Sequence, residues 1–109
     1  MKVSFKWGAD RKLAEDGAAA VKKLGADCAR QLRARLADLH AAQVVGELVA
    51  GQPHPLKGDR KGEFAVKLSG GQRLVFDPED DPVPMTGQGH IDWPRVTRVR
   101  VTFIGDYHD

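Results

Sequence analysis

The sequence contains one cysteine and no long apolar run, and these shortages exclude several classes of protein. Cys28 cannot form an internal disulfide, and no cysteine or histidine lies at the spacing of a structural zinc site. No apolar stretch approaches the roughly 20 residues that a membrane-spanning helix needs. Residues 1–7 alternate polar and apolar side chains, unlike the apolar segment of a secretory signal. We therefore expect a cytoplasmic protein with no membrane role, in which Cys28 is a small core residue on a helix.

The sequence also has little excess charge overall, but its acidic residues are unevenly placed. The formal net charge is +2 at pH 7, and four of the fifteen acidic residues lie within residues 77–81. Without these four acids the net charge is +6, and a domain with such a local excess attracts polyanions through their phosphates. Alternatively, the lysines and arginines form an ordinary solvated surface, as in most mildly basic domains. Composition alone leaves both interpretations open.

The hydrophobic pattern of the first half predicts a strand followed by two helices. Residues 3–7 alternate as in a half-buried strand. Apolar stripes of helical period then predict helices from Asp10 to Gly25 and from Asp27 to Ala50, with the two aspartates as N-caps and a kink near His40.

The second half predicts a loop and three strands. Two prolines and three glycines exclude regular structure over residues 51–62. Alternating residues 63–68 and 72–76 flank a Gly-Gly turn and predict a β-hairpin. Residues 77–95 contain four prolines and predict a long loop insertion before a last strand at 96–104. This order predicts an α+β fold, with two N-terminal helices on one face of an antiparallel-rich sheet of about four strands.

Two segments that flank the predicted sheet are rich in chemically active side chains. One is the loop with His54 and Lys57, and the other is the C-terminal tail, residues 106–108. Cutting RNA without a metal requires a base for the 2′-hydroxyl proton, an acid for the departing 5′-oxygen and cations for the phosphorane. Histidine suits both proton roles because its pKa near 6.5 leaves each form populated at neutral pH. His54 and His108, with Lys57 and Arg73, would meet these requirements.

A purely structural interpretation of the same residues competes with the catalytic one. His54 lies between two prolines and could close a turn, and Arg73 could pair with Asp59. An isolated set of polar residues is weak support for a site. His40 and His90 have no obvious catalytic companion, so we expect neither to be catalytic. The residues alone leave the choice open.

The run from His54 to Gly62, followed by Arg73-Leu74-Val75-Phe76 and the closing Asp106-Tyr107-His108, resembles the HigB group of toxins. These are the killer proteins of plasmid-maintenance systems, in the RelE/ParE toxin superfamily. The resemblance covers nearly the full chain and implies one compact RelE-like toxin domain over residues 1–109. It implies a ribosome-dependent endonuclease of messenger RNA that needs no metal or cofactor. It also implies a HigA-like helix-turn-helix antitoxin as the partner that silences the toxin.

The resemblance assigns five catalytic residues, all in the loop or the tail: His54, Lys57, Asp106, Tyr107 and His108. It implies that the two histidines transfer protons, that Tyr107 stacks on or orients the nucleotide, and that Asp106 orients a histidine. Which histidine is the base stays open. Three cations are expected to contact RNA phosphate: Arg73, Arg60 and Lys61. Asp59 and Arg60 are explained more readily as residues that fix the loop through hydrogen bonds.

Residues 77–95 depart from the family pattern, which has a much shorter connection here. The acidic residues at 77–81 should repel phosphate unless the segment folds away from the RNA or serves the antitoxin instead.

Two other functions are compatible with the same fold. One is a ParE-like inhibitor of DNA gyrase, and the other is an inactive toxin-like binding module that acts in operon autoregulation. The two histidines with Lys57 favour the ribonuclease, because an acid-base nuclease needs them and a gyrase-binding protein does not.

Overall fold

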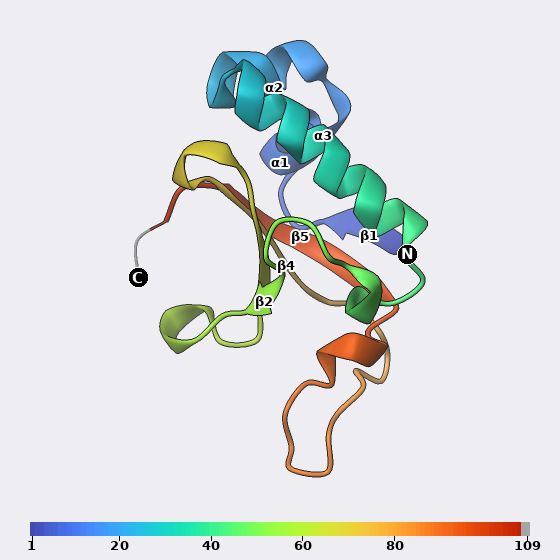
Figure 1. Cartoon of the computed structure of the whole chain (residues 1–109). Helices are drawn as coiled ribbons and strands as arrows, with labels where there is room; N and C mark the ends of the chain where they lie inside the picture. Colours follow the sequence, from blue (N-terminus) through green and yellow to red (C-terminus); the bar gives the residue numbers. More distant parts are fainter. Residues whose placement is uncertain (108–109) are drawn as a thin grey trace.

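The computed structural model describes residues 1–107, which form three α-helices and five strands joined by short 3₁₀ turns (Figure 1). In chain order the helices and strands are β1 (Lys2–Phe5), α1 (Gly8–Glu15), α2 (Gly17–Leu24), α3 (Ala26–Ala41), β2 (His54–Pro55), β3 (Phe64–Lys67), β4 (Arg73–Pro78) and β5 (Arg98–Gly105). No helix in this part of the chain is both long enough and apolar enough to span a bilayer.

The strands form one sheet in the order β1-β5-β4-β3-β2, and the three helices lie on one side of it (Figure 1). β1 runs parallel to β5, and every other neighbouring pair is antiparallel. The predicted hairpin is confirmed as β3 and β4. The sheet has five strands rather than about four, because His54 and Pro55 pair with β3. A strand of two residues that contains a proline is too short to produce an alternating pattern, so the sequence predicted only a loop.

The first predicted helix is wrong in its extent, because two helices replace it. α1 begins at Gly8, and Asp10 lies in its first turn rather than at the cap. The side chain of Asp16 then accepts the backbone N–H groups of Ala18 and Ala19 at 3.0 and 3.1 Å. An aspartate with these bonds is an N-cap, so it starts α2 in the middle of the predicted helix. Trp7, expected in the first strand, precedes α1 and is 55% exposed.

The second predicted helix, Asp27 to Ala50, is also wrong at its ends. α3 begins at Ala26 and stops at Ala41. The N-terminal amine of Met1 donates to the carbonyls of Leu39 and His40 at 2.9 and 3.0 Å, which occupies groups that a helix leaves free at its C-terminus. The backbone N–H of Val45 then donates to the carbonyl of Val96 at 3.0 Å. α3 therefore ends at Ala41, where residues distant in the sequence contact the chain, although the apolar pattern of helical period continues beyond this point.

The core lies between α3 and the covered face of the sheet. Leu32 and Leu39 on α3 are 1% exposed, and Cys28 on the same helix is 3% exposed, as predicted. The sheet side consists of residues of β3, β4 and β5: Phe64, Val66, Leu74, Phe76, Val99, Val101 and Ile104. Burying each large apolar side chain contributes about 1.5–3 kcal/mol, so this layer holds the helices in place. The opposite face, which we call the open face, bears none of the three α-helices (Figure 1).

Candidate active site

Strand register places two of the predicted site residues, His54 and Arg73, on the open face. His54 is opposite Ala65, Ala65 is opposite Val75, and Val75 is opposite Phe103. Directly opposed residues share a face of a sheet, so these four form one row across β2, β3, β4 and β5. Arg73 lies two residues before Val75 and therefore points to the same face. Strands are about 4.8 Å apart, so the backbones of His54 and Phe103 are separated by about 14 Å.

His54 is half-buried, and a backbone contact orients its ring. Its Nδ1 lies 2.7 Å from the carbonyl oxygen of Gln52. A carbonyl oxygen can only accept, so this contact requires a proton on Nδ1. In the neutral ring Nε2 then carries the lone pair. The structure thus prepares His54 to accept a proton at Nε2.

Gly51 anchors the turn that presents His54. Its φ of +85° lies in the left-handed region, and a Cβ there would clash with Cγ1 of Val66. The Gly51 carbonyl accepts the backbone N–H of Lys67 at 2.7 Å. The loop backbone is therefore packed directly against β3, and only glycine allows this approach.

A cleft of about 390 Å³ follows His54 and is lined by His54, Pro55, Leu56, Lys57 and Gly58. Lys57 is exposed and precedes the 3₁₀ turn η2 (Gly58–Arg60), in which Asp59 is exposed, and Lys61 after it is exposed as well. The backbone N–H of Leu56 donates to the carbonyl of Glu63 at 2.9 Å and closes the loop. His54 and Lys57 therefore line the same cleft.

Arg73 does not pair with Asp59, the alternative that the sequence left open. Its Nη1 donates to the carbonyl of Gln72 at 3.1 Å, and among residues 1–107 it forms no ion pair with a carboxylate. The guanidinium keeps most of its donors for another partner.

Arg60 brings the loop and the tail together. Its guanidinium carbon lies 4.5 Å from the ring centroid of Phe103 and 4.7 Å from that of Tyr107. The two rings are 5.9 Å apart and inclined at 73°. Nη1 of Arg60 also pairs with Oε1 of Glu63 at 3.1 Å. The structure therefore places Tyr107 beside the loop, although these residues are far apart in the sequence.

The last predicted site residues lie at the end of the described chain. Asp106 is exposed, and its carboxylate lies beside Gly71 in the turn between β3 and β4. His108 is outside the described residues, so its expected place near His54 stays a prediction. Within residues 1–107 no three histidine, cysteine or acidic side chains are grouped so that they could hold a metal ion.

Three residues of the cluster around Arg60 were not predicted from the sequence: Glu63, Thr102 and Phe103. The alternation of residues 96–104 placed Phe103 on the same face as Val101. A β-bulge breaks this alternation, because Val75 is opposite Phe103 whereas the next residue of β4, Phe76, is opposite Val101. Only the spacing of Arg60 and Glu63, three residues apart with opposite charges, signals part of this cluster in the sequence.

Three of the four acidic residues at 77–81 form hydrogen bonds within the fold. Asp77 accepts two hydrogen bonds from Arg100 at 3.1 and 2.7 Å. Asp80 accepts the backbone N–H groups of Thr97 and Arg98, each at 2.9 Å, and Glu79 bonds the Ser4 hydroxyl. Partial burial alone would raise the pKa of Asp80, but these hydrogen bonds hold it below its usual range. The acids thus fasten the long segment to β5 and β1, while its middle projects away from the sheet (Figure 1).

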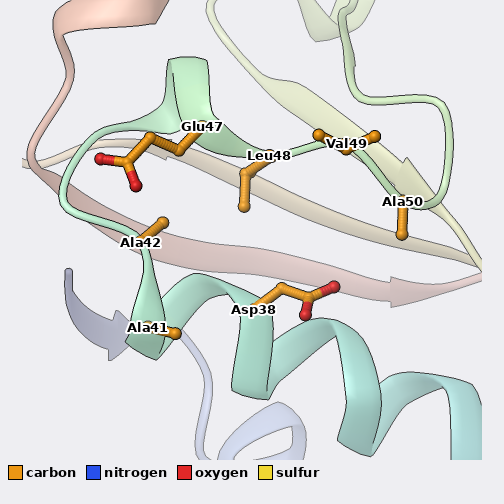
Figure 2. A pocket seen from close by; sticks show the side chains of 7 residues that line it. All are labelled: Asp38, Ala41, Ala42, Glu47, Leu48, Val49 and Ala50. Atoms are coloured by element: carbon orange, nitrogen blue, oxygen red, sulfur yellow. The ribbon is translucent and has the colours of Figure 1, made fainter.

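A second cleft, of about 310 Å³, lies between the end of α3 and the chain that follows it (Figure 2). Asp38 on the helix and Glu47 on the facing segment supply its two carboxylates (Figure 2). Asp38 lies 2.9 Å from Nε of Arg35, and Glu47 accepts the backbone N–H of Gln43. The cleft contains no residue of the predicted site, so it is not part of the open-face cluster.

Comparisons with known proteins agree with this architecture. No family model and no curated protein match the sequence. Among solved structures, a YoeB/ParE toxin from Agrobacterium tumefaciens has a TM-score of 0.59 at 16% identity, over 99% of this chain and 100% of that chain. The YoeB-YefM complex from Staphylococcus aureus gives 0.59 at 13% identity, and the YoeB dimer from the same organism gives 0.57 at 13% identity, each over 100% of this chain and 98% of the other. The chain therefore has the α+β fold of the YoeB/ParE toxins, and the expected RelE-like fold is confirmed.

Proposed function

We propose that this chain is the toxin of a type II toxin-antitoxin system and acts as one domain over residues 1–109. Its activity is the ribosome-dependent cleavage of messenger RNA in the cytoplasm, as in HigB-type toxins. The observation that carries this proposal is the position of His54 and Arg73 on the open face of the sheet, with Tyr107 brought to the adjacent loop. The fold shared with YoeB/ParE toxins supports the toxin class.

The proposed reaction starts at Nε2 of His54. This nitrogen accepts the proton of the 2′-hydroxyl, and the 2′-oxygen forms a bond to phosphorus. The bond from phosphorus to the 5′-oxygen breaks, which leaves a 2′,3′-cyclic phosphate and a 5′-hydroxyl after the departing oxygen takes a proton. The contact of Nδ1 with the Gln52 carbonyl supports His54 as the base. His108 is then the acid, and Asp106 orients it.

Two cations stabilise the charge of the phosphorane in this proposal. Arg73 offers paired donors that match phosphate oxygens, and Lys57 adds a mobile point charge. Lys61 contacts the RNA backbone farther along. Tyr107 stacks on a base, as aromatic side chains do with unpaired nucleotides. No metal or cofactor takes part in any of these steps.

A dedicated antitoxin is the second part of the proposal. The solved YoeB of Staphylococcus aureus is in complex with YefM, which supports a partner for this chain as well. We propose a small HigA-like helix-turn-helix protein, encoded beside the toxin, that covers the site or an edge of the sheet.

The deciding experiment expresses the toxin from an inducible promoter and maps transcript ends. The expected result is growth arrest with cuts inside translated codons, abolished by His54→Ala and relieved by the neighbouring gene product. His40→Ala, at the exposed end of α3, is the matched control and should arrest growth like the wild type. Growth arrest by His54→Ala at equal protein level, with intact transcripts and inhibited gyrase, would replace this proposal with a ParE-like function. No arrest by the wild type would favour the inactive binding module.

A further inference from the structure

Arg60 is expected from the sequence to contact RNA phosphate, yet the fold already encloses its guanidinium. Two aromatic rings, those of Phe103 and Tyr107, lie within 4.7 Å of its central carbon. Its Nη1 pairs with Glu63, and the Arg60 side chain is 28% exposed. A guanidinium with both a carboxylate and two rings as partners has its charge balanced and its planar surface covered.

The partners of Arg60 are themselves held in place. The second carboxylate oxygen of Glu63 accepts the hydroxyl of Thr102, and the Glu63 side chain is 19% exposed. Thr102 and Phe103 are neighbours in the sequence at the β-bulge of β5. The bulge therefore allows two consecutive residues to contact this network. Thr102 contacts it through Glu63, and Phe103 contacts the Arg60 guanidinium directly.

We infer that Arg60, Glu63 and Thr102 form a positioning network that holds Tyr107 against the open face. Tyr107 lies beyond the last residue of β5, Gly105, so the strand ladder does not hold it. The Arg60 and Phe103 side chains contact the Tyr107 ring instead. Arg60 acts through Tyr107 and does not bind phosphate. This inference rests on the proposed function for its catalytic consequence, but not for the position of Tyr107.

The position of Tyr107 can be tested without RNA. Tyr107 is the one tyrosine of the sequence, so labelling tyrosine rings gives NMR signals from this residue alone. Arg60→Gln and Glu63→Gln should each shift these ring signals toward those of an unstructured tyrosine, and Thr102→Val should shift them less in the same direction. The matched control is Arg30→Gln, because Arg30 also pairs with an acid three residues away, Asp27, but its side chain is exposed on α3 and belongs to no part of this network. Unchanged ring signals in folded Arg60→Gln and Glu63→Gln would overturn the inference.

Cleavage kinetics on translating ribosomes separate positioning from phosphate binding. Arg60→Gln should lower kcat about tenfold, since a misplacement of about 1 Å can cost up to roughly 10²-fold, and KM should change less than twofold. The salt dependence of RNA binding should stay as in the wild type. Arg60→Lys keeps the charge but not the planar stack, so kcat should stay low.

The opposite pattern would overturn the inference. A raised KM with unchanged kcat, a salt slope smaller by about one and full recovery in Arg60→Lys would identify Arg60 as a phosphate contact. If the wild type cleaves no RNA, the proposed function fails, and the NMR signals still decide whether Arg60 holds Tyr107.

Discussion

The two ends of the open face both carry acidic and basic side chains, but the acids are used differently at each end. At the end formed by β5, β1 and the long segment, Asp77 pairs with Arg100 and Asp80 accepts backbone donors of β5. At the end formed by β2 and the following loop, Lys57 and Lys61 form no ion pair with a carboxylate in the described part of the chain, and neither does Arg73 at the start of β4.

This difference explains why the acidic residues do not argue against RNA binding. Asp77 pairs with Arg100, so part of the negative charge at that end is cancelled. Lys57, which lines the cleft beside His54, has no carboxylate partner among residues 1–107. The proposed phosphate site thus lies at the β2 end of the open face, and the hydrogen bonds that hold the long segment lie at the opposite end. Four predictions test this division.

The largest effect is expected at the end with unpaired cations. His54→Ala and Arg73→Ala should each lower the single-turnover rate of RNA cleavage by about 10²- to 10⁴-fold, because positioned acid-base groups and charge-stabilising donors contribute factors of this size. Circular dichroism should show an unchanged fold. His90→Ala, in the projecting part of the long segment, is the control and should cleave at the wild-type rate. Equal activity of His54→Ala and His90→Ala would place the chemistry elsewhere.

Gly51 should show how rigidly the first end is built. Gly51→Ala should lower the free energy of unfolding by about 2–4 kcal/mol, since a Cβ clash and a left-handed φ both oppose the side chain. Gly58→Ala is the control, because Gly58 also has a positive φ, of +62°, but nothing lies within 4 Å of an added Cβ. Urea unfolding should show a loss of about 1 kcal/mol or less for it. Equal losses would show that the close approach to Val66 has no energetic weight.

Asp80 lies at the end of the open face formed by β5 and the long segment. It should raise the free energy of unfolding only when its carboxylate is ionised. Its pKa is lowered in the folded protein from the ordinary value of 3.8, so its contribution is present above that value and is lost as the pH falls through the folded-state pKa. Asp80→Ala should therefore be less stable by about 1 kcal/mol at pH 7, and this difference should shrink as the pH falls below 3.8. Urea unfolding at pH 7 and in acid measures this. A difference that persists in acid would contradict the role of the carboxylate charge. The cleavage rate should not change.

The smallest effect is expected for Lys61. Lys61→Gln should weaken RNA binding a few-fold and lower the slope of affinity against salt by about one, as for the loss of one phosphate contact. Lys22→Gln, on α2 at the helical side, should leave the slope unchanged. Titrations at several salt concentrations provide the comparison, and equal slopes for the two variants would remove Lys61 from the RNA interface.

Local pattern in the sequence predicted much of this molecule. The helical stripe through Cys28, Leu32 and Leu39, the hairpin of β3 and β4, and the cation-rich loop all depend on residues close in the sequence. Their periods follow from the geometry of a single helix or strand, so they can be recognised without the rest of the fold. The resemblance in the loop and the tail then led to the RelE-like fold, which the comparisons confirm.

Only the tertiary structure decided where these pieces end and which of them meet. The Met1 amine ends α3, the β-bulge turns Phe103 to the open face, and Arg60 reaches Tyr107 across the sheet. Each of these results joins residues that are more than 25 positions apart, and no local period encodes such a contact. The sequence by itself therefore determined the core-facing stripe of α3, the hairpin and the chemically active side chains. Strand register and the contact of Arg60 with Tyr107 decided which of those side chains lie near one another, because these pairings join residues that are distant in the sequence.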